Sequence, residues 1–375
     1  MELKRILNLE GLLRKKSFFL LGPRSTGKST LIGQQLGRKA LIIDLLDSDY
    51  YLRLQSRPKD LEFMIENRKL VVLDEIQKIP QLLDEVHRLI EKKKITFLLT
   101  GSSARKLKRN HSNMLAGRAW VANLFPLVTD EIPSFNLDRY LQYGGLPQVY
   151  SSKYPVEELK AYVKTYLYEE IQSEALARNI PSFSRFLEVA ALFNGELINF
   201  TNIGSDSQLS PSTVREYYRL LEDTLMGFML QPWTKSKKRK AIQTAKFYFF
   251  DTGVVSTLAR TETLDRNSDL YGKAFEHFIG MELKAYLSYR RLSDELTFWR
   301  SINGQEVDFI IGNHTAIEVK STKKVDEKHL KGLRALREEN YFKKYYLISH
   351  DAIPQTIHGI ICRPWKTFLE ELWKK

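Results

Sequence analysis

The stretch FFLLGPRSTGKST, residues 18–30, joins a short apolar run to a glycine-rich turn and a segment that can begin a helix. Its spacing Gly22-x-x-x-x-Gly27-Lys28-Ser29 is that of a phosphate-binding loop, or P-loop. Glycines let the backbone fold around an anion, so that successive N–H groups and the helix N-terminus point at the phosphates. We therefore expect a strand, a nucleotide-binding turn and a helix. The expected nucleotide contacts come from Gly22, Pro23, Arg24, Ser25, Thr26, Gly27, Lys28, Ser29 and Thr30.

Two residues of this loop and two carboxylates further along predict its chemistry. Lys28 can reach the β- and γ-phosphates of a nucleoside triphosphate, and the Ser29 hydroxyl can bind Mg²⁺. The run LVVLDE, residues 70–75, is an apolar strand that ends in two acids, as a buried parallel strand would. Asp74 can hold the magnesium shell, and Glu75 can orient or deprotonate the attacking water. The sequence thus predicts a protein that binds and hydrolyses a nucleoside triphosphate with Mg²⁺.

Further strands and helices alternate around these two runs. Residues 40–45 form an apolar run, Pro80 opens a helical pattern that reaches about Lys93, and residues 95–103 form a strand with small hydroxyl residues at its end. Such alternation predicts an α/β fold with a mostly parallel sheet, and a ligand at the carboxyl ends of its strands.

Composition favours a soluble globular protein of two or three domains. The chain has 375 residues, 43% hydrophobic and 27% charged, and no apolar run approaches the ~20 residues of a membrane span. The one cysteine, Cys362, excludes an intramolecular disulfide framework and a cysteine-rich zinc site. We therefore expect a cytoplasmic protein without a membrane partner.

The chain is strongly basic, with a formal charge of +13. This charge predicts a polyanionic partner, most simply DNA. It is clustered in two runs without acids: five Lys and Arg between Thr100 and Thr129, and six between Lys235 and Phe250. Each run by itself could equally be a solvated loop.

The P-loop, the LVVLDE strand and LLTGSS, residues 98–103, together resemble an AAA+ ATPase. Further stretches resemble the archaeal and bacterial AAA ATPases that carry a C-terminal domain of unknown function. These stretches are LAGR (115–118), FPL (125–127), YGGLP (143–147) and FYFFDTG (247–253). The resemblance covers nearly the whole chain.

This resemblance implies roles for three more residues. Thr100 or Ser102 would sense the γ-phosphate or the water, and Arg118 would be an arginine finger that stabilises the transferring phosphoryl group. A structural or nucleic-acid-contacting role for Arg118 remains open. The AAA+ interfaces would make the protein a homo-oligomer.

Four domains are expected: an AAA+ core (1–133), a helical lid (134–180), a winged helix (181–251) and a nuclease-like domain (252–375). The winged helix is predicted from helices at 183–193 and 212–224 and strands at 226–232 and 244–250, which a basic loop at 235–240 connects. That loop could rest on DNA phosphates. A protein–protein module is the alternative.

The last domain holds a pattern of Glu276, Asp308, Glu318 and Lys320. EVDFII and TAIEVK, residues 306–311 and 315–320, predict a hairpin in which Asp308 lies opposite Glu318. In the same register Glu306 faces Lys320. Strict alternation puts one set of residues on a shared apolar face: Val307, Phe309, Ile311, Ile317 and Val319.

Opposed carboxylates destabilise a sheet unless a divalent cation such as Mg²⁺ lies between them. We therefore expect Glu276, Asp308 and Glu318 to bind metal, and Lys320 to position a water or stabilise developing charge. The pattern resembles the PD-(D/E)XK nuclease core. An amphipathic hairpin and a nuclease fold without chemistry are the alternatives.

These features together predict an ATP-driven enzyme that acts on DNA, whose C-terminal domain binds and possibly cleaves it. The alternative is a nucleotide-dependent switch or assembly factor whose nuclease-like domain is an inactive binding module.

Overall fold

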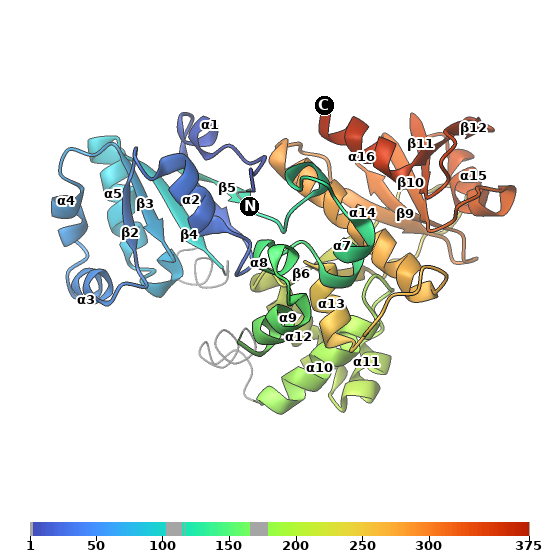
Figure 1. Cartoon of the computed structure of the whole chain (residues 1–375), viewed down its shortest axis with the longest axis horizontal. Helices are drawn as coiled ribbons and strands as arrows, with labels where there is room; N and C mark the ends of the chain where they lie inside the picture. Colours follow the sequence, from blue (N-terminus) through green and yellow to red (C-terminus); the bar gives the residue numbers. More distant parts are fainter. Residues whose placement is uncertain (1–2, 103–114, 116, 166–178, 375) are drawn as a thin grey trace. The chain divides into compact units, whose positions relative to one another are not determined.

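The computed structural model of the chain describes residues 3–102, 115, 117–165 and 179–374 (Figure 1). The chain forms two units. The first runs to Leu127 and includes Asp223–Met226; the second comprises Val128–Glu222 and the chain from Gly227 onward.

A sheet of parallel strands carries the P-loop in the first unit, as the alternating pattern predicts. Its strands are β1 (Ser17–Leu21), β2 (Leu41–Asp44), β3 (Leu70–Asp74), β4 (Thr96–Gly101) and β5 (Ala119–Asn123). Their spatial order is β2-β3-β4-β1-β5. Because β4 lies between β1 and β3, its carboxyl end stands between the P-loop and the Asp74–Glu75 pair.

Helices cover both faces of this sheet. They are α1 (Leu9–Leu13), α2 (Lys28–Leu36), α3 (Ser48–Ser56), α4 (Asp60–Ile65) and α5 (Leu82–Lys93), with a 3-10 turn, η1 (Ile76–Lys78), after β3. Phe19, Val71 and Phe97 belong to a core that includes residues of α3, α4 and α5. Phe18 and Val72, which alternate with them, are also fully buried. Both faces are thus apolar, as a parallel sheet requires.

A larger sheet, of eight strands, forms the second unit. Its order is β12-β13-β11-β10-β9-β8-β6-β7. The bounds are β6 (Gly227–Pro232), β7 (Lys246–Phe249), β8 (Leu296–Arg300), β9 (Glu306–Ile311), β10 (Thr315–Lys320), β11 (Lys344–Ser349), β12 (Gln355–Ile357) and β13 (Ile360–Pro364). The predicted strands β6 and β7 form an antiparallel pair, and β6 continues the sheet by pairing with β8. The boundary predicted after residue 251 therefore does not separate two sheets.

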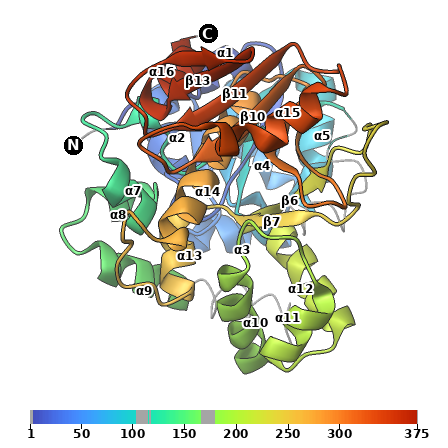
Figure 2. The same cartoon turned by 90° about the vertical axis from the view of Figure 1, so that its right-hand side faces the viewer.

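The helices of this unit are η2 (Thr129–Glu131), α7 (Leu137–Tyr143), α8 (Pro147–Ser151), α9 (Pro155–Thr165), α10 (Ile180–Leu192), α11 (Phe200–Ser207), α12 (Pro211–Asp223), α13 (Thr252–Leu258), α14 (Asp269–Tyr289), η4 (Glu327–Leu330), α15 (Lys331–Arg337) and α16 (Trp365–Lys374). Figure 2 shows β10, β11 and β13 side by side, and α10, α11 and α12 gathered together away from them. Among the described residues, no helix is long and apolar enough to cross a membrane.

The segment predicted as a lid is built into the second unit. Its helices α7 and α9 both contact α13, which directly follows β7. The carboxylate of Asp251 accepts hydrogen bonds from the backbone N–H of Gly145 (2.8 Å) and Val254 (3.1 Å). A Cβ at Gly253 would lie only 2.1 Å from the carbonyl oxygen of Tyr143. The YGGLP and FFDTG stretches therefore pack against each other, and the close approach of their backbones explains why Gly253 is a glycine.

Glu282 on α14 holds the segment through which the chain enters the second unit. Its carboxylate accepts hydrogen bonds from the Thr129 N–H (2.7 Å) and hydroxyl (3.1 Å) and from the Trp373 indole (2.6 Å). Burial raises the pKa of Glu282 to about 7, although these hydrogen bonds lower it.

The hairpin of β9 and β10 has the predicted turn but not strict alternation. Ile311 pairs with Thr315, as predicted, and the ladder reaches Phe309–Ile317. Between the pairs Thr297–Ile310 and Trp299–Val307, β9 contains one extra residue against β8. This bulge turns Val307 into the core that holds Ile310 and Ala316. The prediction that Val307 shares a face with Phe309 was therefore wrong.

Candidate functional site

The P-loop follows β1 and ends at Gly27, which precedes α2 with a φ of +90°. A Cβ at Gly22 would lie 2.4 Å from the Leu124 carbonyl oxygen, so this position requires glycine. Lys28 is buried, and its Nζ donates to the carbonyl oxygens of Gly22 (2.8 Å) and Pro23 (3.0 Å). The ammonium is thus held within the turn, where a bound phosphate would lie.

The remaining loop residues divide into buried and accessible positions. Thr26 is buried and its hydroxyl donates to Pro23 (2.8 Å). Arg24 is half-buried, while Ser25, Ser29 and Thr30 are exposed.

The end of β3 brings the predicted magnesium ligands together. The Ser29 hydroxyl donates to Asp74 Oδ2 at 2.8 Å, and the Thr100 hydroxyl donates to Asp74 Oδ1. Thr100 Oγ1 also accepts a hydrogen bond from the Glu75 N–H (2.9 Å). Asp74 is buried, and its Oδ2 faces the Ser29 hydroxyl at the start of α2. Oxygen donors in this arrangement suit Mg²⁺.

Glu75 has a left-handed backbone, with φ +60°, directly after the strand. Its carboxylate accepts a hydrogen bond from the amide of Gln77, which also donates to the Ser102 hydroxyl (3.3 Å). Sequence analysis did not identify Gln77, because a residue of η1 carries no motif signal. The structure therefore brings Glu75 and Ser102 together through a third side chain.

Arg5 was also missed. Its guanidinium donates to the carbonyl oxygens of Thr26 (2.7 Å) and Phe125 (2.6 Å), and thereby ties the P-loop to the segment after β5.

Arg118 lies away from the P-loop of its own chain. It precedes β5, whose first residue Ala119 pairs with Ser17, whereas the P-loop follows the other end of β1. The five residues of β1 separate these two edges by on the order of 13 Å. Arg118 forms an ion pair with Glu91 on α5. A finger role can therefore be exerted only on a neighbouring chain. Residues 103–114 and Ala116, which hold the rest of this basic run, lie outside the described residues.

In the second unit, Glu276 on α14 is paired with two residues of β7. Its Oε1 accepts a hydrogen bond from the Tyr248 hydroxyl (2.5 Å) and lies 3.2 Å from Lys246 Nζ. Lys246 also lies 2.6 Å from Glu306 Oε1. Burial alone would raise the pKa of Glu276, but Lys246 and Tyr248 lower it below its usual value. Glu306, which was expected to face Lys320 across the hairpin, forms its ion pairs with Lys246 and with Arg300 (3.2 Å).

Asp308, Glu318 and Lys320 come together on the hairpin as predicted. Lys320 Nζ lies 2.5 Å from Glu318 Oε1 and 3.9 Å from Asp308 Oδ2. Asp308 Oδ2 also accepts the Val319 N–H (2.8 Å). Burial and the charge of Glu276 raise the pKa of Asp308 to about 6, and burial with the charge of Asp308 raises the pKa of Glu318 well above its usual value.

The fit of a metal ion to this cluster rests on two carboxylates. Among the described residues, no three His, Cys, Asp or Glu side chains are grouped so that they could hold a metal ion. Glu318 Oε2, however, is buried without a hydrogen-bond partner. Mg²⁺ commonly takes one or two carboxylates and keeps several waters. Asp308 and Glu318 fit that requirement, and the metal role predicted for Glu276 stays a prediction.

The basic loop at 235–240 is anchored through its backbone. Glu339 accepts hydrogen bonds from the N–H groups of Lys237 (2.8 Å) and Lys238 (3.1 Å). The side chains of both lysines, and those of Lys235 and Lys240, are exposed. Arg239 is instead paired with Glu338.

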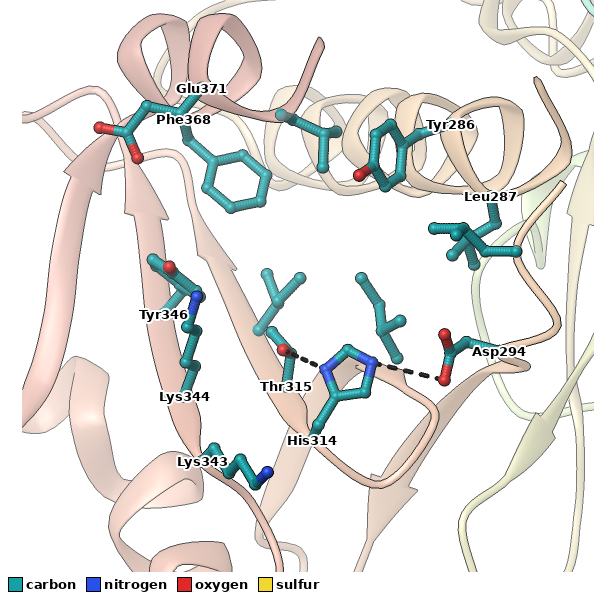
Figure 3. A pocket seen from close by; sticks show the side chains of 14 residues that line it. Tyr286, Leu287, Asp294, His314, Thr315, Lys343, Lys344, Tyr346, Phe368 and Glu371 are labelled. Atoms are coloured by element: carbon teal, nitrogen blue, oxygen red, sulfur yellow. Dashed lines mark hydrogen bonds and ion pairs between the residues drawn. The ribbon is translucent and has the colours of Figure 1, made fainter. Parts of the chain in front are cut away.

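A separate cavity of about 410 Å³ lies between α14, α16 and the strands β9, β10 and β11 (Figure 3). Figure 3 shows Tyr286, Leu287 and Phe368 along one side and His314 on the other. His314 Nε2 lies 3.4 Å from Asp294 Oδ1. None of the predicted site residues lines this cavity.

Three family models match successive parts of the chain. Residues 14–133 match an AAA domain, residues 134–265 match a domain of unknown function (DUF8612), and residues 271–368 match a domain of unknown function (DUF4143).

The similar curated proteins are uncharacterized. Two of them, from Mycobacterium bovis and Mycobacterium tuberculosis, are each 25% identical over 314 residues, which cover 81% of this chain and 70% of the relative. One from Methanocaldococcus jannaschii is 22% identical over 276 residues, which cover 66% of this chain and 59% of the relative. The parallel sheet, the P-loop and the AAA match together indicate a nucleotide-hydrolysing ATPase of the AAA type that carries a C-terminal DUF4143 domain.

Proposed function

We propose that the first unit hydrolyses ATP at the site formed by the P-loop, Asp74 and Glu75. The observation that carries this proposal is the Asp74 carboxylate, which hydrogen bonds to Ser29 on α2 and to Thr100 on β4. Side chains from two elements, α2 and β4, therefore converge on one carboxylate at the end of β3, beside the phosphate-binding turn. Glu75 follows directly, with its backbone held by Thr100.

Each residue then has a distinct task in phosphoryl transfer. Lys28 and the loop N–H groups bind the phosphates, while Ser29 and Asp74 hold the metal ion. Mg²⁺, when bound there, neutralises charge on the β- and γ-phosphates. Glu75 accepts a proton from the water that attacks the γ-phosphorus, and the bond to the β-phosphate oxygen breaks to release ADP. Thr100 or Ser102 senses the γ-phosphate or this water, and Arg118 of a neighbouring chain supplies positive charge in a homo-oligomer.

Replacement of Lys28 by alanine tests the binding part of this proposal. Fluorescent ATP should bind Lys28→Ala much more weakly than wild type, because the variant loses the cation held inside the turn. Lys39→Ala is the matched control, since Lys39 follows α2 and pairs with Glu10 at the surface. Equal affinity of Lys28→Ala and Lys39→Ala would contradict the site.

We further propose that the second unit acts on DNA. Exposed lysines on the anchored loop at 235–240 support phosphate contact, since phosphates attract fixed cations without regard to sequence. The helices α10–α12 with the β6–β7 hairpin support a winged-helix arrangement. Charge reversal at Lys237 and Lys238 should weaken DNA binding and reduce its salt dependence. An unchanged salt slope would place the DNA surface elsewhere.

The cluster of two buried carboxylates, Asp308 and Glu318, with the partly exposed Lys320 supports phosphodiester hydrolysis on that DNA. Asp308 and Glu318 would hold Mg²⁺, which would polarise the phosphate and its attacking water. Lys320 would orient that water and stabilise the developing negative charge. Attack of the water oxygen on phosphorus breaks one P–O ester bond, and leaves a phosphate monoester and a hydroxyl group. The fold of α14 with this hairpin supports the resemblance to PD-(D/E)XK nucleases.

A Mg²⁺-dependent cleavage assay on plasmid DNA, with and without ATP, tests this second activity. Wild type should nick or linearise the plasmid, and Asp308→Asn should not, while its ATP hydrolysis persists. DNA binding without cleavage would instead favour a nucleotide-dependent switch or assembly factor. One observation supports that alternative: lysines already neutralise Glu276 and Glu318.

A further inference from the structure

Lys246 differs in its surroundings from the exposed lysines that precede it in the sequence. It belongs to the basic run between Lys235 and Phe250, yet its side chain is only 4% exposed. Its Nζ lies 2.6 Å from Glu306 Oε1 on β9 and 3.2 Å from Glu276 Oε1 on α14. One ammonium group therefore bridges two carboxylates that come from different elements.

The ammonium is also fixed in place. Its Nζ lies 5.3 Å from the centre of the Phe298 ring, on the strand next to β9. The Tyr248 hydroxyl, on the same strand as Lys246, donates to the Glu276 oxygen that faces the ammonium. Glu276 Oε1 thus accepts hydrogen bonds from two donors on β7, the Lys246 ammonium and the Tyr248 hydroxyl. The side chains of Glu276 and Glu306 are 22% and 25% exposed, so most of each carboxylate's surroundings is protein, and the ammonium offsets the cost of removing their charges from water.

Two carboxylates around one cation are also the arrangement that a divalent metal ion takes. Two-metal phosphodiesterases place two such ions about 3.5–4 Å apart. Here the pair Glu276 and Glu306, which binds Lys246, adjoins a second pair, Asp308 and Glu318. In the second pair, Glu318 Oε2 is buried without a hydrogen-bond partner.

We propose that the Lys246 ammonium permanently occupies a cation site formed by Glu276 and Glu306, so that the cluster takes one divalent ion rather than two. Glu276 is then a positioning residue that holds Lys246 and Tyr248, and metal binding is left to Asp308 and Glu318. The count of one ion rests on the proposed metal role of Asp308 and Glu318. The occupancy of the Glu276–Glu306 site by Lys246 does not.

An ion could reach the site if the ammonium were removed. A cavity of about 350 Å³ borders it, lined in part by Lys246, Lys273, Glu276, Arg300 and Glu306. Arg300 reaches only Glu306, at 3.2 Å, and is partly exposed. Loss of Lys246 would therefore remove the ammonium that lies 3.2 Å from Glu276, leave Lys320 to act on this carboxylate from a longer range, and make the Glu276–Glu306 pair a ligand for a divalent ion.

Mn²⁺ titration followed by electron paramagnetic resonance, without nucleotide, tests this inference in the full-length protein. Relative to Asp308→Asn, the double variant Lys246→Met/Asp308→Asn should bind one additional Mn²⁺ ion. A further Glu306→Gln substitution should remove that ion again. Lys273→Met/Asp308→Asn is the matched control and should gain nothing, since Lys273 lines the same cavity but pairs with Glu196.

Thermal melts give a second readout. Mn²⁺ at a hundredfold excess over its Kd for the new site should raise the Tm of Lys246→Met/Asp308→Asn by roughly 5–10 °C above its metal-free value, and the same addition should not shift the Tm of Asp308→Asn by that amount. If the variant is unfolded in metal-free buffer, Mn²⁺ should restore its folding. Lys246→Gln, which keeps a hydrogen-bond donor, provides the same test with less disturbance.

The inference is overturned if removal of the Lys246 charge yields neither an additional ion nor a metal-dependent gain in Tm or folding. Failure of the proposed metal site has a different signature. Wild type would then bind no more Mn²⁺ than Asp308→Asn, while the double variant would still gain its ion.

Discussion

Thr100 provides a direct test of how the candidate ATPase site is held together. Its hydroxyl is fully buried, donates to Asp74 and accepts the Glu75 N–H at 2.9 Å. Thr100→Val keeps the shape of the side chain but removes both hydrogen bonds. A hydrogen bond to a charged group contributes about 1.5–3 kcal/mol, and a buried donor left without a partner costs about 1–3 kcal/mol. We therefore expect a loss of roughly 3 kcal/mol in the stability of the first unit.

The same change should slow turnover. If the loss of these hydrogen bonds raises the activation free energy by about 1.4 kcal/mol, kcat falls tenfold. Urea unfolding followed by circular dichroism and steady-state phosphate release measure the two effects. Thr100→Ser is the control, because it keeps the hydroxyl. If Thr100→Val matches Thr100→Ser in both unfolding and turnover, Thr100 does not position Asp74 and Glu75.

Three further predictions follow from the geometry of both units. Arg118→Ala should bind nucleotide normally but lose turnover, and mixing it with Glu75→Gln should restore phosphate release at shared interfaces; full activity of Arg118→Ala alone would exclude a finger. Burial holds the folded pKa of Glu282 near 7, above its usual 4.5, so its contribution to stability is complete below pH 4.5 and is lost as pH rises through 7, by about 3 kcal/mol. Urea unfolding at pH 5 and pH 8 should show this loss in wild type and not in Glu282→Gln. An equal change in the free energy of unfolding between the two pH values in both proteins would contradict the prediction. Gly253→Ala should destabilise by about 1–3 kcal/mol, because its Cβ meets a backbone carbonyl oxygen, whereas Gly33→Ala on α2 has open space and should lose nothing in a thermal melt.

Local patterns predicted much of the first unit. The P-loop, the LVVLDE strand and the helix after Pro80 are each specified by residues near one another in sequence. Their relation follows from the rule that parallel strands present ligands at their carboxyl ends. Gln77 and Arg5 escaped prediction because their partners are set by tertiary contacts, and neither belongs to a recognisable spacing.

The second unit shows where local patterns fail. The hairpin turn at Gly312 was predicted correctly, but the bulge in β9 depends on pairing with β8, which the sequence does not reveal. Lys246 lies close in sequence to exposed lysines, so it was included in the basic run between Lys235 and Phe250 that predicted a polyanionic partner. Its burial follows from β6 joining the larger sheet, which carries β7 against α14.

The sequence also did not reveal which part of the chain the segment predicted as a lid packs against, because that contact is likewise tertiary. Helical spacing identified the segment, but not the surface that it covers. The contact of Gly145 with Asp251 connects residues more than a hundred positions apart.

The most direct test of the central claim, that Glu75 is the general base of an ATP-hydrolysing site, is a phosphate-release measurement on Glu75→Gln. The variant keeps the P-loop, Asp74 and the Thr100 hydrogen bond to its backbone, and loses only the proton-accepting carboxylate. It should bind ATP with an affinity close to that of wild type and release almost no phosphate, and the bound nucleotide should be recovered as ATP. Phosphate release at the wild-type rate, or recovery of the bound nucleotide as ADP, would contradict the assignment.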